Sequence, residues 1–308
     1  MSSPPLVPPI KCQGIKTKLV AEIANMVGEM PSGRWIEPFC GSAVVALNLQ
    51  PKRALLCDSN VHIIQFYKDI QEGRLTPLGV REFLSEHGTK LLSVGEDYFY
   101  EVRERFNRAP NSFVFLFLNR SCFNGVMRFN RSGKFNVPFC RKPERFAPAY
   151  ITKIVNQVQT ISKVVAASDW EFRVADFRES LATAKVGDLV YADPPYAGRH
   201  TDYFNGWSDQ DEENLAELLA NLPCKFILST WHSNEFRTNV QVQKNWASDN
   251  FHVFTKAHYY HVGAAEELRH PMLEALITNF GYSKAVGSHE MSQQSLFVEQ
   301  QRARYLSI

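Results

Sequence analysis

The sequence contains no apolar run that approaches the 18 residues a membrane-spanning helix requires. Its first residues, from Met1 to Pro5, also lack the charged segment followed by an apolar one that marks a secretory signal. We therefore expect no membrane span and no export, and a chain that works in the cytoplasm.

Cysteine is sparse, with six residues scattered along the chain and no C-x-x-C spacing. This pattern argues against a zinc site and against a disulfide framework. We expect buried, reduced thiols and no metal.

An excess of charge of one sign is also missing, since the formal net charge is only +2. The distribution is uneven, however, because residues 101–145 hold ten basic side chains against three acidic ones. Basic side chains neutralise phosphates, and Asn and Arg can read base edges. The segment predicts a DNA contact, and an ordinary solvated basic face is the alternative.

At 308 residues the chain is longer than the usual single domain, so we expect one large domain with an inserted module. Apolar spacing predicts a helix between Ile151 and Val165, and Ser208 with Asp211 forms a capping box for a helix that ends near Ala220. Strands are expected at 172–175, 188–192 and 225–230. The apolar run 113–118 fits a helix or a strand by its period.

The tetrapeptide Asp193-Pro194-Pro195-Tyr196 follows the apolar run 189–192 directly. An Asp at the carboxyl end of a buried parallel strand lies where open α/β sheets bind their ligands. The two prolines fix φ and lack N–H donors, so the carbonyls of the turn remain free acceptors. With Tyr196 as a stacking surface, the tetrapeptide fits the exocyclic amine of a nucleobase. A purely structural turn is the alternative.

A second pattern lies upstream, where a strand at 35–38 enters the small-residue turn 39–43 and a helix begins at Val44. The next strand, 54–57, ends in Asp58, 17 positions beyond Gly41. Its carboxylate can accept from two ribose hydroxyls. Because the three-glycine dinucleotide pattern is absent, a nucleoside without phosphates fits better than a dinucleotide. A structural turn is again the alternative.

The loop 197–207 carries three aromatic residues and two glycines. A long loop inside a compact domain is often functional, so these residues are candidates for a lid over a base or a cofactor. A packed loop without that role is the alternative.

The chain resembles the S-adenosylmethionine-dependent DNA adenine methyltransferases of the Dam-like alpha group from about Pro9 to Tyr282. Two positions depart from the family pattern: Cys12 replaces the usual Trp of the first motif, and Ala43 replaces the usual second glycine of the cofactor turn. The likeness is carried by the segments KCQGIK (11–16), EPFCGSA (37–43), DSN (58–60), NRSCFNG (119–125), KFNVPF (134–139), DF (176–177), DPPY (193–196) and EALITN (274–279).

This resemblance implies an α/β fold, with a mostly parallel Rossmann-like methyltransferase sheet, helices on both faces and an inserted, mostly helical DNA-recognition domain. The implied division is 1–65 for the cofactor-binding half, 66–163 for the insert, 164–282 for the catalytic half and 283–308 for a polar tail. It favours a helix for 113–118. Bacterial or phage origin and double-stranded DNA as partner follow from the same likeness, and a cognate restriction endonuclease is a possible second partner.

The implied reaction is methyl transfer to the exocyclic amine of a flipped adenine in DNA, with S-adenosylmethionine as cofactor. Catalysis would fall to Asp193, Pro194, Pro195 and Tyr196. The cofactor residues would be Lys11, Gly14, Lys16, Glu37, Pro38, Phe39, Gly41, Ser42, Asp58, Asn60, Asp176, Phe177 and Asp193. The DNA-binding residues would be Arg120, Asn124, Arg128, Asn130, Arg131, Lys134, Asn136 and Arg141.

Two alternatives to this function remain open at the level of sequence. One is a methyltransferase that acts on cytosine amines or on RNA, and the other is a sequence-specific DNA-binding protein that has lost catalysis.

Overall fold

A computed structural model describes residues 4–130, 132–196, 206–234, 237–259 and 271–282. Their centre is a seven-stranded sheet with the order β3-β2-β1-β4-β5-β7-β6. The first five strands of this order pair in parallel, and β7 runs antiparallel to both β5 and β6. The strands are β1 (Trp35–Glu37), β2 (Arg53–Asp58), β3 (Asp169–Val174), β4 (Leu189–Ala192), β5 (Lys225–Asn234), β6 (His252–Tyr259) and β7 (Pro271–Thr278).

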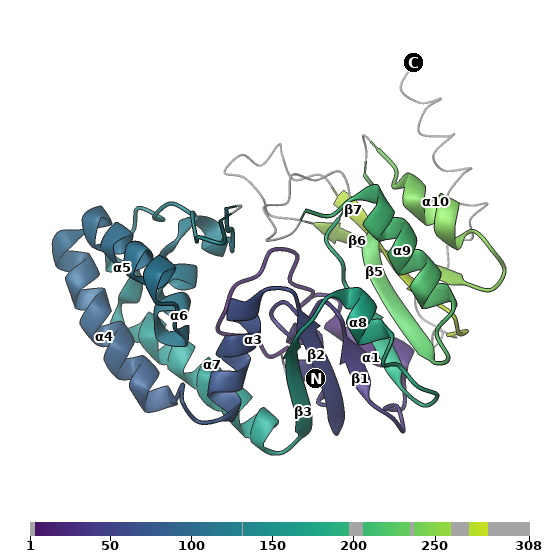
Figure 1. The fold of residues 1–308 in the computed structure, drawn as a ribbon, viewed down its shortest axis with the longest axis horizontal. Coiled ribbons are helices and arrows are strands. Elements are labelled where there is room, and N and C mark those ends of the chain that lie inside the picture. Colours follow the sequence, from purple (N-terminus) through teal and green to yellow (C-terminus); the bar gives the residue numbers. More distant parts are fainter. Residues whose placement is uncertain (1–3, 131, 197–205, 235–236, 260–270, 283–308) are drawn as a thin grey trace.

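Helices cover both faces of the sheet, as the apolar strand residues require (Figure 1). Neighbouring residues of one strand point to opposite faces, so Trp35 joins one apolar cluster and Ile36 joins another. The first cluster includes α1 (Val20–Val27), α2 (Val44–Leu49) and α3 (Val61–Gln71), and the second includes α8 (Phe177–Leu181), α9 (Asp209–Ala220) and α10 (Val240–Trp246). The expected α/β fold is confirmed.

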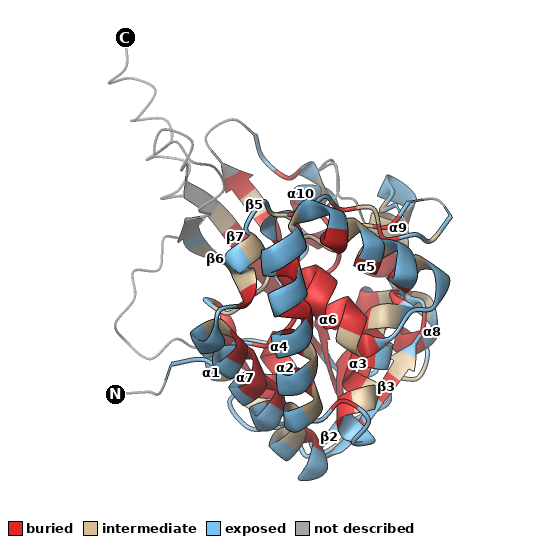
Figure 2. Cartoon of the chain, turned by 90° about the vertical axis from the view of Figure 1, so that its left-hand side faces the viewer, coloured by how far each residue is buried: buried red, intermediate tan, exposed pale blue. Residues whose placement is uncertain are grey.

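The segment between β2 and β3 adds a helical lobe beside the sheet (Figure 1). It consists of α4 (Pro77–Val94), α5 (Glu96–Arg108), α6 (Ser112–Ser121) and α7 (Pro148–Ala166), with short 3-10 turns at Phe123–Gly125 and Pro143–Phe146. The ambiguous run 113–118 is a helix, and α6 is buried along most of its length (Figure 2).

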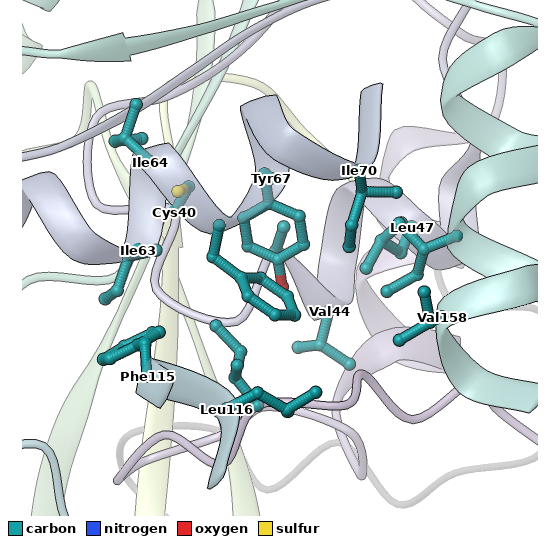
Figure 3. Packing of buried hydrophobic residues seen from close by; sticks show 14 of the residues in the cluster. Cys40, Val44, Leu47, Ile63, Ile64, Tyr67, Ile70, Phe115, Leu116 and Val158 are labelled. Carbon is teal, nitrogen blue, oxygen red and sulfur yellow. The ribbon is translucent and has the colours of Figure 1, made fainter. Parts of the chain in front are cut away.

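This lobe shares one apolar core with the sheet. Phe115 and Leu116 of α6 lie against the α3 residues Ile63 and Tyr67 in a single buried cluster (Figure 3). The boundaries expected at residues 65 and 163 therefore fall inside α3 and α7, which are continuous helices. The lobe and the sheet therefore pack around one common core.

Most expected elements are present, including the helix of 151–165 within α7 and the capping box of α9. β5 continues beyond the expected end at 230, because its second half pairs with β7. No helix in the described ranges is long and apolar enough to cross a membrane. The tail 283–308 and most of the expected lid, 197–205, lie outside the described residues.

Candidate active site

A pocket of about 1240 Å³ opens at the carboxyl ends of the parallel strands. Chain order reverses between β1 and β4, which is where open α/β sheets bind ligands. The volume of this pocket exceeds the roughly 300–1,000 Å³ of common small-molecule sites, so the pocket has room for a cofactor and part of a substrate. All expected cofactor and catalytic residues line it: Lys11, Gly14, Lys16, Glu37, Pro38, Phe39, Gly41, Ser42, Asp58, Asn60, Asp176, Phe177, Asp193, Pro194, Pro195 and Tyr196.

Asp193 follows β4 and forms an ion pair with Lys16, whose Nζ lies 3.0 Å from Oδ1. Lys16 is only 4% exposed, whereas the Asp193 side chain keeps an opening to the pocket. Burial raises the pKa of Asp193 to about 6, although the Lys16 ammonium opposes that rise. At neutral pH the site therefore presents an ionised carboxylate as a hydrogen-bond acceptor.

Tyr196 lies beside this pair. Lys16 Nζ donates to Tyr196 Oη at 2.8 Å and lies 4.9 Å from the centre of its ring. The same hydroxyl is 3.1 Å from Oε2 of Glu274, and the ring packs against Trp231. The ring is thus held from several elements at the edge of the pocket.

Glu37 ends β1 and is almost completely buried. Its Oε1 accepts from the indole N–H of Trp35 at 2.8 Å and from the backbone N–H of Ala46 at 2.9 Å. Burial raises the pKa of Glu37 to about 8, although both hydrogen bonds favour ionisation. An approaching cation would favour the ionised form.

Asp58 organises the turn after β1 from the end of β2. Its two carboxylate oxygens accept from the backbone N–H groups of Gly41 at 2.9 Å and of Asn60 at 2.8 Å. Burial raises the pKa of Asp58, and these two bonds oppose the rise. Ala43 adopts φ 52° in the same turn, a left-handed conformation in which the family's usual glycine carries no strain.

An aromatic group forms another wall of the pocket. The ring of Phe39 stacks on that of Phe177 at 5.5 Å, and Trp207 lies edge-on to Phe39 at the same distance. The buried Nε1 of Trp207 has no hydrogen-bond partner among the described residues. Asp176 caps α8 by accepting from the backbone N–H of Arg178 and also pairs with its guanidinium.

The helical lobe reaches the pocket through the loop after α6. Asn124 lines the pocket, and Phe123 beside it is 54% exposed. The buried Asn119 ties this loop to the N-terminal segment: its Oδ1 accepts from Lys11 N at 2.7 Å, and its Nδ2 donates to the carbonyls of Lys11 and Gly125. The lobe and the 11–16 segment therefore form one wall.

Several expected DNA-binding residues stabilise the chain that follows this loop. Arg128 Nε donates to Asn136 Oδ1 at 2.8 Å, and its guanidinium also reaches the Asn136 carbonyl. Asn130 Oδ1 accepts from two backbone N–H groups of its own turn. Lys134 and Arg141 are exposed, whereas Arg131 lies outside the described residues.

Arg120 occupies a different environment from the other basic residues. It is only 5% exposed, and its guanidinium donates to Gln157 at 2.7 Å and to the hydroxyl of Tyr150 at 3.2 Å. Both partners belong to α7, so the side chain joins α6 to α7. This placement gives Arg120 a structural role and offers DNA little of its surface.

The cysteines are all free thiols, four of them buried. Burial raises the pKa of Cys12 and of Cys40 well above the ordinary thiol value. Within the described ranges no group of three His, Cys, Asp or Glu side chains could hold a metal ion. Phe123 and Tyr191 are among the pocket residues to which the sequence assigned no site role, and the contact of Glu274 with Tyr196 was not expected either. Trp207, at the end of the expected lid loop, also lines the pocket.

Sequence comparisons with known proteins show which family the chain is similar to. The sequence model of the D12 class N6 adenine-specific DNA methyltransferases matches residues 13–263, well over half of the chain. The chain is 31% identical over 219 residues to the retron Ec67 DNA adenine methylase of Escherichia coli, covering 68% of this chain and 71% of that protein. It is 30% identical over 250 residues to the DNA adenine methylase of Serratia marcescens, covering 77% and 85%. The modification methylase StsI of Streptococcus sanguinis is 28% identical over 285 residues, covering 88% of this chain and 42% of that protein.

Proposed function

The chain belongs to the D12 class of N6 adenine-specific DNA methyltransferases, and we propose that it uses S-adenosylmethionine to methylate a flipped adenine in double-stranded DNA, with Asp193 as the acceptor for the adenine amine. The observation that carries these roles is the buried Lys16–Asp193 pair at the pocket edge. The alternatives of cytosine or RNA methylation do not match this family.

The pocket residues suit S-adenosylmethionine. Asp58 lines the pocket with a carboxylate that would accept from ribose hydroxyls, and Phe39 and Phe177 would offer faces for an adenine ring. Trp207 adds a buried N–H donor without a partner among the described residues. When bound, the cofactor supplies an activated methyl group on its sulfonium.

Asp193 and the Pro194 carbonyl would accept hydrogen bonds from the adenine amine. The lone pair of that nitrogen is delocalised into the ring, so it is a poor nucleophile. Acceptors fixed beside it stabilise the positive charge that develops during transfer. Because the nitrogen is inaccessible inside a duplex, the adenine has to leave the base stack, and Tyr196 would then stack on it.

The helical lobe would hold the DNA, since its loop 123–127 lines the pocket and its exposed basic residues can meet phosphates. The setting is the cytoplasm of a bacterial or phage-infected cell. The name of one relative, a modification methylase, supports a partner endonuclease, and an enzyme that works without such a partner is the alternative.

Two substitutions, each measured for methylation and for cofactor binding, test the assigned roles. Asp193→Ala should abolish methylation and leave the cofactor Kd within a few-fold, because the carboxylate addresses the substrate amine. Asp58→Ala should weaken cofactor binding about ten- to a hundredfold, from a loss of roughly 1.5–3 kcal/mol in hydrogen bonds. Methylation of unmethylated DNA and calorimetric cofactor titration provide the two readouts. Asp193→Ala activity above a tenth of wild type would refute the role of the carboxylate.

A further inference from the structure

Glu274 lies on β7, far in sequence from the tetrapeptide, yet it contacts the same tyrosine. We propose that Glu274 is a positioning residue of the methyl-transfer site: it fixes the plane of the Tyr196 ring and shares the Lys16 ammonium with Asp193. The proposal rests on the function proposed above and adds a role outside the cofactor and tetrapeptide motifs.

The hydrogen-bond directions follow from the chemistry of the three groups. An ammonium can only donate, so the Tyr196 hydroxyl accepts from Lys16 at 2.8 Å. Its single proton is then directed to Oε2 of Glu274 at 3.1 Å. Lys16 also donates to the Gly14 carbonyl at 2.9 Å and to Asp193 at 3.0 Å. The result is a relay from Glu274 through Tyr196 and Lys16 to the proposed catalytic carboxylate.

The relay is buried. Glu274 is 1% exposed and Tyr196 is 8% exposed. A buried charge is costly unless it is paired and hydrogen-bonded, so the contacts with Lys16 and Tyr196 stabilise Glu274 at this position. Trp231 of β5, which pairs with Glu274 across the strands, packs on the Tyr196 ring.

Fixation of the hydroxyl determines how the ring can stack. The backbone holds one end of Tyr196 next to the prolines, and Lys16 with Glu274 holds the other. A phenolic O–H prefers to lie in the plane of its ring, so a donor and an acceptor fixed around the hydroxyl favour one rotation of the ring about its long axis. A flipped base needs such a defined ring plane as its stacking partner. Phenylalanine at this position would keep the ring and lose the fixed plane.

Glu274 also affects the charge on Asp193. Two carboxylates flank one ammonium, with Lys16 Nζ 3.0 Å from Asp193 and 3.9 Å from Glu274. Lys16 lowers the pKa of Asp193, and the Glu274 charge raises it. The Asp193 charge also contributes to the raised pKa of Glu37, a further acidic group of the pocket that stays unchanged in the tests below.

The decisive variants are Glu274→Gln and Tyr196→Phe, with Thr278→Val as the matched control. Thr278 is buried on the same strand and donates to the Phe280 carbonyl, outside the relay. The acidic limb of kcat/KM against pH is measured on unmethylated DNA, because this limb reports ionisations of the free enzyme. Stacking is measured with 2-aminopurine at the methylated adenine, once that site is mapped by sequencing.

We expect Glu274→Gln to move the acidic limb to lower pH, since the charge that raises the pKa of Asp193 is gone. Tyr196→Phe should leave the limb in place, change the 2-aminopurine fluorescence of the bound complex and lower kcat several-fold. Thr278→Val should change neither the acidic limb nor the 2-aminopurine fluorescence nor kcat. A merely structural role for Glu274 would lower the melting temperature without moving the limb.

The proposal is overturned if the limb of folded Glu274→Gln coincides with that of wild type. If Glu274→Gln does not fold, Tyr196→Phe decides alone, and wild-type kcat with wild-type fluorescence overturns the relay. Asp193→Ala and wild type in the same assay separate this proposal from the function proposed above. Absence of adenine methylation by wild type refutes that function, and activity of Asp193→Ala above a tenth of wild type refutes the role of Asp193. An inactive Asp193→Ala beside an unmoved limb in Glu274→Gln refutes only the role of Glu274.

Discussion

The ionisation of Asp193 gives the activity a pH dependence that follows from a single residue. Burial raises the pKa of Asp193 to about 6. In the proposed mechanism the ionised carboxylate stabilises the positive charge that develops on the adenine amine, and the neutral carboxyl lacks the negative charge that does so. Protonation therefore removes activity as the pH falls through that value. We expect kcat/KM to fall about tenfold per pH unit below roughly pH 6. A profile that stays flat down to pH 5 would contradict this assignment.

The raised pKa of Glu37 leads to a second prediction, that cofactor binding releases a proton. Burial raises the pKa of Glu37 to about 8, so the carboxyl is mostly protonated at pH 7. A sulfonium in the pocket would lower that pKa, and binding should release up to about one proton. Calorimetry at pH 7 in two buffers with different ionisation enthalpies measures this release. It should disappear in Glu37→Gln and shrink with S-adenosylhomocysteine, which lacks the sulfonium charge. Equal binding heats in both buffers would contradict the prediction.

Sequence patterns predicted which residues line the site, but not which groups their side chains contact. Spacing and the family likeness assigned Gly41, Asp58 and Asp193 to one site, and all three line the same pocket. The assignment succeeds because the carboxyl ends of parallel strands meet at one edge of the sheet. Lys16 was expected beside the cofactor, and the structure places its ammonium on Asp193. The direction of a long, flexible side chain depends on three-dimensional neighbours, and so does the contact of Glu274 with Tyr196.

Among the elements, α6 connects the helical lobe to the pocket through Asn119. Asn119→Ala should remove the hydrogen bonds to both main-chain groups of Lys11 and lower the free energy of unfolding by about 1–3 kcal/mol. Urea unfolding provides the measurement. Asn221→Ala is the matched control, because Asn221 is exposed and its side chain donates one hydrogen bond, to the Glu217 carbonyl at the end of α9. Its effect should stay within about 0.5 kcal/mol. Equal stabilities of the two variants would show that Asn119 does not act as a clamp.

The elements themselves were predictable wherever local chemistry determined them. The Ser208–Asp211 capping box and the apolar face of α7 are signals within one segment. The extension of β5 depends on pairing with β7, which no local pattern encodes. The burial of Arg120 likewise arises because α6 packs on α7, and its charge alone suggested a surface position.

At the scale of the whole molecule, exposure distinguishes the basic residues that can contact DNA from those that stabilise the fold. The net charge is only +2, so DNA affinity has to come from a local surface. Within the expected DNA-binding set, Lys134 and Arg141 are exposed, whereas Arg120 is buried against Tyr150 and Gln157.

Alanine substitutions at Lys134 and Arg141, assayed for DNA binding at two salt concentrations, test this surface. A phosphate contact predicts weaker binding to all sequences and a salt slope reduced by about 1, whereas a base contact predicts a loss of about 1–3 kcal/mol on the preferred site alone. Lys90→Ala is the control, since Lys90 is exposed on α4 and pairs with Glu86. Arg120→Ala should lower stability instead. If Lys134→Ala and Arg141→Ala both bind like the Lys90 variant, the DNA-recognition surface lies elsewhere on the molecule.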